Sequence, residues 1–103
     1  KPLLVVETAY PWSLENNDNM GNLVGPQTEL LPEFEPSVDG QRRFLQAELD
    51  LLKRVPDGQG KGLFYWAADD ITSPRFGSVF ENAATFDFEG QVLESLRVFL
   101  TPP

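Results

Sequence analysis

The chain has 103 residues, of which 41% are hydrophobic, so it can form one small packed domain or part of a larger one. It contains neither cysteine nor histidine, which excludes disulfides, thiolate metal sites and catalysis by Ser-His-Asp or Cys-His groups from this segment. The net charge of −8 repels phosphate backbones, so we expect no nucleic-acid partner. No apolar run approaches the roughly twenty residues of a membrane span.

The first strand is predicted over residues 3–9, where Leu3-Leu4-Val5-Val6 is an unbroken apolar run followed by Glu7. A run without alternation is typical of a parallel strand that is buried on both faces. Glu7 is therefore expected at the carboxyl end of a strand, the edge where α/β sheets and barrels place their chemistry. The plainer alternative is that Glu7 is a solvated residue at the strand end or pairs with an arginine.

A long polar loop is predicted over residues 13–36, because its glycines and prolines exclude regular structure. A loop of this length inside a compact domain is unusual and is often functional, with a plain surface connection as the alternative. A helix is predicted over residues 38–55, with Ser37 as its N-cap and an apolar stripe along one face. We interpret this helix as scaffold.

A second strand is predicted over residues 62–67, which are rich in aromatic side chains. A second loop over residues 68–86 and a final helix over residues 89–100 follow, the helix because Val92, Leu93 and later apolar residues recur at one-turn spacing. The predicted strand–helix–strand unit forms a right-handed crossover, so the two strands should run parallel.

The predicted order is β-α-β-α, with long loops after both strands and short connections before them. Long loops at the carboxyl ends of parallel strands build a site there, whereas short loops at the other end serve stability. Two parallel strands cannot close a barrel, so we predict an α/β fold in which residues 1–103 are one quarter of a TIM (β/α)8 barrel. The chain enters its first strand directly after Lys1, so we expect it to be part of a longer protein, with no signal peptide in this segment.

Several blocks spread over nearly the whole chain resemble glycoside hydrolase family 53, the arabinogalactan endo-β-1,4-galactanases. In chain order they are Val6-Glu7-Thr8-Ala9-Tyr10-Pro11-Trp12, Gly40-Gln41, Phe44-Leu45, Gly62-Leu63-Phe64-Tyr65-Trp66, Phe80-Glu81-Asn82-Ala83-Ala84-Thr85-Phe86-Asp87-Phe88-Glu89-Gly90 and Leu93-Glu94-Ser95-Leu96. The resemblance rests on these blocks together and in this order.

The resemblance implies that the chain supplies the C-terminal strands 7 and 8 of a retaining glycosidase that hydrolyses β-1,4-galactan and arabinogalactan side chains of plant polysaccharide. It places the nucleophile on Glu7 and a sugar platform on Trp66, with Tyr10 and Trp12 as weaker substrate-binding candidates. The general acid would lie on strand 4, outside this chain, so the segment alone should be inactive. A buried core tryptophan is the plainer alternative for Trp66.

The resemblance also implies a secreted, cell-surface or periplasmic location. One departure concerns Ala67-Ala68-Asp69-Asp70, which stands where many relatives have Glu-Pro and a further tryptophan. The outer sugar subsites, and with them the preferred chain length of the substrate, should therefore differ from those of such relatives.

Oxygen-bearing side chains recur at every second position around Met20, a spacing that suits a hard cation. Some bacterial relatives hold calcium between the two long loops, so the resemblance implies a structural Ca²⁺ with Asn16, Asp18, Asn22 and Asp70 as ligands. Met20 stands where those relatives have histidine, and a thioether is a poor calcium ligand. An Asx-rich turn without a cation is the alternative, and the chemistry itself requires no cofactor.

Two other functions are compatible with the residues alone. A non-catalytic carbohydrate-binding module would also carry exposed aromatics beside an acidic surface, and the isolated chain would then bind galactan. A small independent α/β interaction domain would fold cooperatively as a 103-residue monomer, whereas a barrel quarter has open strand edges that favour aggregation.

Overall fold

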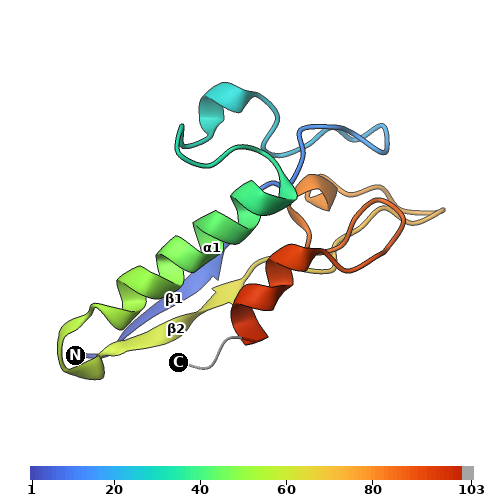
Figure 1. Ribbon diagram of the computed structural model, residues 1–103. Helices are drawn as coiled ribbons and strands as arrows, with labels where there is room; N and C mark the ends of the chain where they lie inside the picture. The colour runs from blue at the N-terminus through green and yellow to red at the C-terminus, as the bar shows by residue number, and fades with distance from the viewer. Residues whose placement is uncertain (101–103) are drawn as a thin grey trace.

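The computed structural model describes residues 1–100. Two parallel strands lie side by side beneath one long helix, and the loops that follow the strands gather beyond the strand ends (Figure 1). The main elements in chain order are β1 (Leu3–Thr8), α1 (Val38–Lys53), β2 (Gly60–Tyr65) and the 3-10 helix η4 (Glu94–Leu100). Short 3-10 turns also occur at η1 (Gln27–Glu29), η2 (Pro56–Gly58) and η3 (Glu81–Ala83). The predicted parallel strand–helix–strand unit is confirmed.

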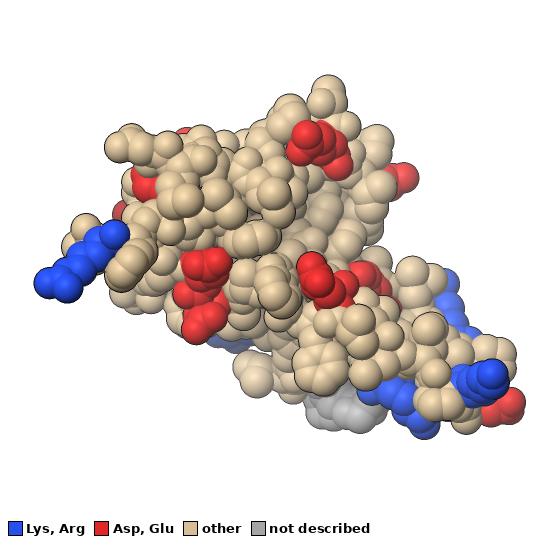
Figure 2. Space-filling model, turned by 180° about the vertical axis from the view of Figure 1, so that it is seen from behind, with Lys and Arg blue, Asp and Glu red and all other residues tan. Residues whose placement is uncertain are grey.

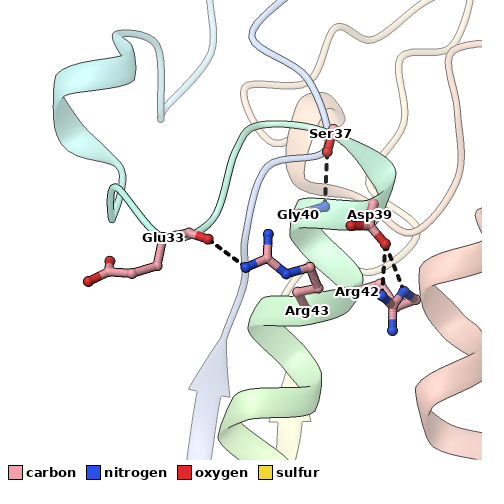
Figure 3. Close-up of polar contacts among 6 residues, drawn as sticks. All are labelled: Glu33, Ser37, Asp39, Gly40, Arg42 and Arg43. Atoms are coloured by element: carbon pink, nitrogen blue, oxygen red, sulfur yellow. Dashed lines mark hydrogen bonds and ion pairs between the residues drawn. The ribbon is translucent and has the colours of Figure 1, made fainter.

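Helix α1 begins with a complete set of N-terminal signals (Figure 3). The hydroxyl of Ser37 accepts a hydrogen bond from the backbone N–H of Gly40 at 2.9 Å, as an N-cap should. Asp39 lies in the first turn, where its charge complements the helix dipole, and pairs with Arg42 at 2.8 Å. The guanidinium of Arg43 donates to the carbonyl of Glu33 at 3.0 Å and so ties the preceding loop to the helix.

Helix α1 packs on β2 and on η4, and Leu3 and Val5 of β1 share a hollow with it. Leu45 and Leu52 are buried on the apolar stripe of the helix. The backbone of Gly60 passes close to the helix, since a Cβ atom there would lie 1.9 Å from the carbonyl oxygen of Leu52. Close approach of this kind is where a strand needs glycine.

The face of the sheet opposite α1 is uncovered within residues 1–100. The prediction that both strands are buried on both faces does not hold in this chain, since Val6 is 72% and Phe64 61% exposed. A two-stranded sheet with one apolar face open to solvent is marginal on its own. The exposed face is therefore the surface that further strands of a larger sheet would cover.

The final helix predicted over residues 89–100 is wrong in extent and type. Residues 94–100 form a 3-10 helix, and the residues before it form an irregular turn in which Phe86 bridges to Val92. The carboxylate of Asp87 accepts hydrogen bonds from the N–H groups of Glu89 and Gln91, and Gly90 has a φ of 81°. Such side-chain hydrogen bonds give the backbone an alternative to helix.

Candidate functional site

The carboxyl ends of β1 and β2 meet at a small hollow that Glu7 and Trp66 both line. The hollow has a volume of about 120 Å³, and its other walls come from the residues just after β1, such as Pro11, and from the two long loops, such as Leu23 and Phe80. Trp66 follows β2 directly and is 50% exposed, so it is not a core residue in this chain. Glu7 and Trp66, the candidate nucleophile and the candidate sugar platform, thus line one common cavity.

A β-bulge in β1 decides the direction in which Glu7 points. Leu3 and Val5 line a hollow against α1, which fixes the helix-facing side of the strand. Thr8 also faces α1, because its hydroxyl donates to the carboxylate of Glu48 at 2.7 Å. Strict alternation would place Thr8 on the opposite side from Val5.

The pairing between the strands explains the change of side. Val5 pairs with Leu63 and Thr8 pairs with Tyr65, so three steps on β1 match two steps on β2. One extra residue in a strand is a bulge, and bulges re-aim side chains near active sites. The bulge leaves Glu7 on the surface, beside the hollow that it shares with Trp66.

Glu7 is not paired with an arginine in the structure. The ion pairs found within residues 1–100 join Asp39 to Arg42 and Glu94 to Arg97, and neither includes Glu7. The carboxylate is exposed at the end of β1, free to face a ligand from the open side of the sheet.

Tyr10 and Trp12 lie differently from Trp66. Tyr10 is only 5% exposed, its ring stacks on Phe44 at 4.3 Å between centroids, and its hydroxyl donates to the carbonyl of Phe34 at 2.6 Å. Burial raises its pKa. The ring thus packs against the core, although Tyr10 also lines the hollow that Glu7 and Trp66 share. Its role in substrate binding stays a prediction. Trp12 is half-buried, with its ring 4.7 Å from that of Phe88.

Hydrogen bonds around two carboxylates hold the two long loops together. The hydroxyl of Thr72, in the second loop, lies 2.5 Å from Asp18 Oδ2 and 2.6 Å from Glu81 Oε2. Glu81 is 1% exposed and also accepts from the backbone N–H of Asn17 at 2.6 Å. Asp18 accepts further from the N–H of Ser78 at 2.7 Å. The hydrogen bond from Thr72, followed by those from backbone N–H groups, lowers the pKa of Asp18.

The residues predicted to bind calcium do not fit a calcium site in this arrangement. Three donors of the chain already occupy the oxygens of Asp18, the third being the N–H of Met20 at 2.7 Å. Asn16 and Asp70 are exposed, and Asn22 offers one buried oxygen without a hydrogen-bond partner. A calcium ion takes six to eight oxygen ligands. Within residues 1–100, no group of three or more His, Cys, Asp or Glu side chains could hold a metal ion.

Sequence reasoning missed a buried polar cluster behind the strand ends. Gln41 is 0% exposed, and its side chain bonds to Tyr10, Tyr65, Ala84 and Ser95. Burial raises the pKa of Tyr65 to about 12. A glutamine within the first turn of an otherwise amphipathic helix, on its apolar side, was the available signal.

Parallel strands joined through a helix, with long loops at the carboxyl ends of the strands, are typical of an α/β barrel. The fold therefore indicates a protein of the α/β-barrel class. Comparison with known proteins then identifies the family. The profile of glycosyl hydrolase family 53 matches residues 1–99. The chain belongs to this family of glycoside hydrolases.

Individual relatives agree with this assignment. An "Uncharacterized protein in bgaB 5'region" of Niallia circulans is 42% identical over 92% of this chain and 27% of its own length. The "Arabinogalactan endo-beta-1,4-galactanase" of Cellvibrio japonicus (strain Ueda107) is 39% identical over 84% of this chain and 23% of its own length. Among solved structures, the "Ignisphaera aggregans GH53 catalytic domain" matches with a TM-score of 0.88 and 36% identity, over 96% of this chain and 29% of that one.

The chain spans less than a third of the length of these relatives. It is therefore a fragment of an α/β barrel domain rather than an independent small interaction domain. Within residues 1–100, no helix has both the length and the apolar character needed to cross a membrane.

Proposed function

We propose that the chain supplies the seventh and eighth βα units, and the nucleophile Glu7, to a retaining endo-β-1,4-galactanase. The single observation that carries the proposal is the hollow that Glu7 and Trp66 share at the carboxyl ends of β1 and β2. The galactanase name of the Cellvibrio japonicus relative supports a β-1,4-galactan as the substrate.

A retaining glycosidase needs two carboxyl groups about 5 Å apart, one to attack the anomeric carbon and one to protonate the leaving oxygen. Glu7 is suited to the attacking role because its carboxylate is exposed at the end of β1, where it is open to a ligand. Its oxygen forms a bond to the anomeric carbon as the glycosidic bond breaks. The acid on strand 4 gives its proton to the departing sugar and then, as a base, activates the water that releases the product.

Trp66 provides a flat apolar surface beside Glu7. Galactose has a face of C–H groups that can cover an indole ring while its hydroxyl groups bond elsewhere, and half of the Trp66 surface is free for such a contact. The side of the molecule in Figure 2 carries acidic side chains over its middle, while most lysines and arginines lie toward its ends. This charge distribution suits a neutral polysaccharide better than a polyanion.

The test uses a chain that carries residues 1–103 within a whole barrel, called the complete barrel protein below. Glu7→Gln should lower the hydrolysis of β-1,4-galactan by at least about a thousandfold, roughly 4 kcal/mol of transition-state stabilisation, while sugar binding persists. Glu89→Gln, which neutralises an exposed carboxylate in the turn before η4, is the matched control and should leave turnover unchanged.

A second variant identifies the role of the carboxylate as nucleophile. Glu7→Ala leaves room for azide, which would attack the anomeric carbon from the vacated side and yield the α-galactosyl azide. Retained hydrolysis in Glu7→Gln would eliminate the assignment. Binding of galactan by the isolated 103-residue chain would instead favour a carbohydrate-binding module.

A further inference from the structure

The hydroxyl of Tyr65 ties the end of β1 to the loop that follows β2. It accepts a hydrogen bond from the backbone N–H of Tyr10 at 3.1 Å and donates one to the carbonyl of Ala83 at 2.6 Å. These two partners are main-chain groups, so the hydroxyl constrains the path of the backbone, and it also accepts from Nε2 of Gln41 at 3.1 Å. Tyr65 is the last residue of β2 and immediately precedes Trp66.

The side-chain amide of Gln41 makes the same connection from α1. Its Nε2 donates to the carbonyl of Tyr10 at 2.8 Å and to the carbonyl of Ala84 at 3.1 Å. Its Oε1 accepts from the hydroxyl of Ser95 in η4. The amide lies in the protein interior, where an unmade hydrogen bond is costly. One side chain thus links α1, η4, the end of β1 and the loop after β2.

Tyr65 and Gln41 bond to main chain that lies close in sequence to Glu7 and Trp66, the proposed active-site pair. The N–H of Trp66 donates to the carbonyl of Thr8 at 2.8 Å, directly after Glu7. Two residues further on, the N–H of Tyr10 donates to the hydroxyl of Tyr65, and its C=O accepts from the side-chain amide of Gln41. The bulge in β1 removes a regular ladder bond from this stretch, so side chains supply the constraint that the ladder does not.

We infer that Tyr65 and Gln41 are positioning residues, which hold Glu7 and Trp66 at the separation and orientation needed for attack on the anomeric carbon. The inference rests on the proposed function of Glu7. Neither side chain touches the hollow that Glu7 lines, so both act through the backbone of Tyr10. Small displacements of a nucleophile cost large factors in rate because reaction needs near-attack geometry.

The decisive variant is Tyr65→Phe in the complete barrel protein, since phenylalanine keeps the ring and removes only the hydroxyl. Thr85→Val is the matched control: it also removes a buried hydroxyl that donates to a backbone carbonyl, that of Ala68 at 2.8 Å, without touching Tyr10. Gln41→Glu is a second variant, which keeps an acceptor for Ser95 and loses the donation to Tyr10 and Ala84.

The measurement is the rate at which a 2-deoxy-2-fluoro-galactoside with a good leaving group forms a covalent adduct with the protein. Adduct formation reports the position of the nucleophile directly, and thermal unfolding of each variant reports stability separately. Tyr65→Phe and Gln41→Glu should slow trapping at least tenfold and lower kcat by a similar factor, with KM changed less than threefold. Thr85→Val should form the adduct at the wild-type rate, even if its thermal stability falls as far as that of Tyr65→Phe.

Wild-type trapping rates in folded Tyr65→Phe would overturn the inference, as would equal slowing in Thr85→Val. If Tyr65→Phe fails to fold, Gln41→Glu decides by the same criteria. The outcome for Glu7→Gln stays separate: loss of turnover in that variant together with normal trapping in Tyr65→Phe rejects the positioning role and leaves the proposed nucleophile intact.

Discussion

Substitution of Gly40 by alanine should destabilise the protein, although alanine is the better helix former. A Cβ atom at residue 40 would lie 1.7 Å from the carbonyl oxygen of Glu35, whereas real Cβ atoms essentially never come within 3.0 Å of a neighbour. The obstacle is backbone, so the Glu35–Ser37 turn must move by more than about 1 Å. That movement also withdraws the Ser37 hydroxyl from the N–H of residue 40.

The magnitudes decide the sign. Alanine in place of glycine gains about 1 kcal/mol of helix propensity. Overpacking costs about 1–3 kcal/mol, and loss of the Ser37 cap costs about 1 kcal/mol more. The net expectation for Gly40→Ala is a loss of about 1–3 kcal/mol in the free energy of unfolding.

Urea unfolding of the complete barrel protein measures this loss. Gly25→Ala is the control, because a Cβ atom there meets nothing closer than 3.9 Å and the φ of Gly25 is not positive. The control should change stability by less than about 0.5 kcal/mol. Ser37→Ala isolates the cap and should cost about 1 kcal/mol. A Gly40→Ala protein as stable as wild type would refute the close contact on which the reasoning depends.

Two further predictions concern the loops and the buried phenol. Thr72→Val removes the hydroxyl between Asp18 and Glu81, so amide exchange over residues 13–36 and 68–86 should accelerate. In the wild-type protein, EDTA should leave the melting temperature unchanged because the donor set does not fit calcium. A rise in melting temperature on addition of Ca²⁺ would contradict this. The pKa of Tyr65, raised from 10.0 to about 12, implies a contribution to stability that is complete below pH 10 and lost as the pH rises through about 12. Two pKa units correspond to roughly 3 kcal/mol, so the urea midpoint of Tyr65→Phe should fall less steeply than that of wild type over this range, and parallel curves would disprove the assignment.

The strand–helix–strand order could be predicted because each element carries its own local signal. The apolar run that forms β1 (Leu3–Thr8) and the capped amphipathic stretch that forms α1 (Val38–Lys53) depend little on distant residues. The turn before η4 could not be predicted from apolar spacing. There the carboxylate of Asp87 competes with the helix for backbone N–H groups.

The candidate site was only partly predictable for a related reason. Glu7 and Trp66 could be predicted as neighbours because each lies at the carboxyl end of a parallel strand, and these ends meet at the same edge of the sheet. The burial of Glu81 and Gln41 depends on partners that are distant in the chain, for example Asn17, 64 residues from Glu81, and Ala84, 43 residues from Gln41. Residue type predicts that such polar residues lie at the surface, and only their tertiary hydrogen bonds offset the free-energy cost of burying them.

The side of the sheet on which Glu7 lies is determined by the pairing of two strands and not by the sequence of β1 alone. In β1 alone, alternation from Val5 would turn Glu7 toward α1, against the carboxylate of Glu48 and the apolar helix face. Two carboxylates there would repel one another, and neither would reach a ligand at the open side of the sheet. The extra residue between the Val5 and Thr8 pairs reverses the parity. Thr8 therefore faces α1, where its hydroxyl donates to Glu48, and Glu7 lines the hollow beside Trp66.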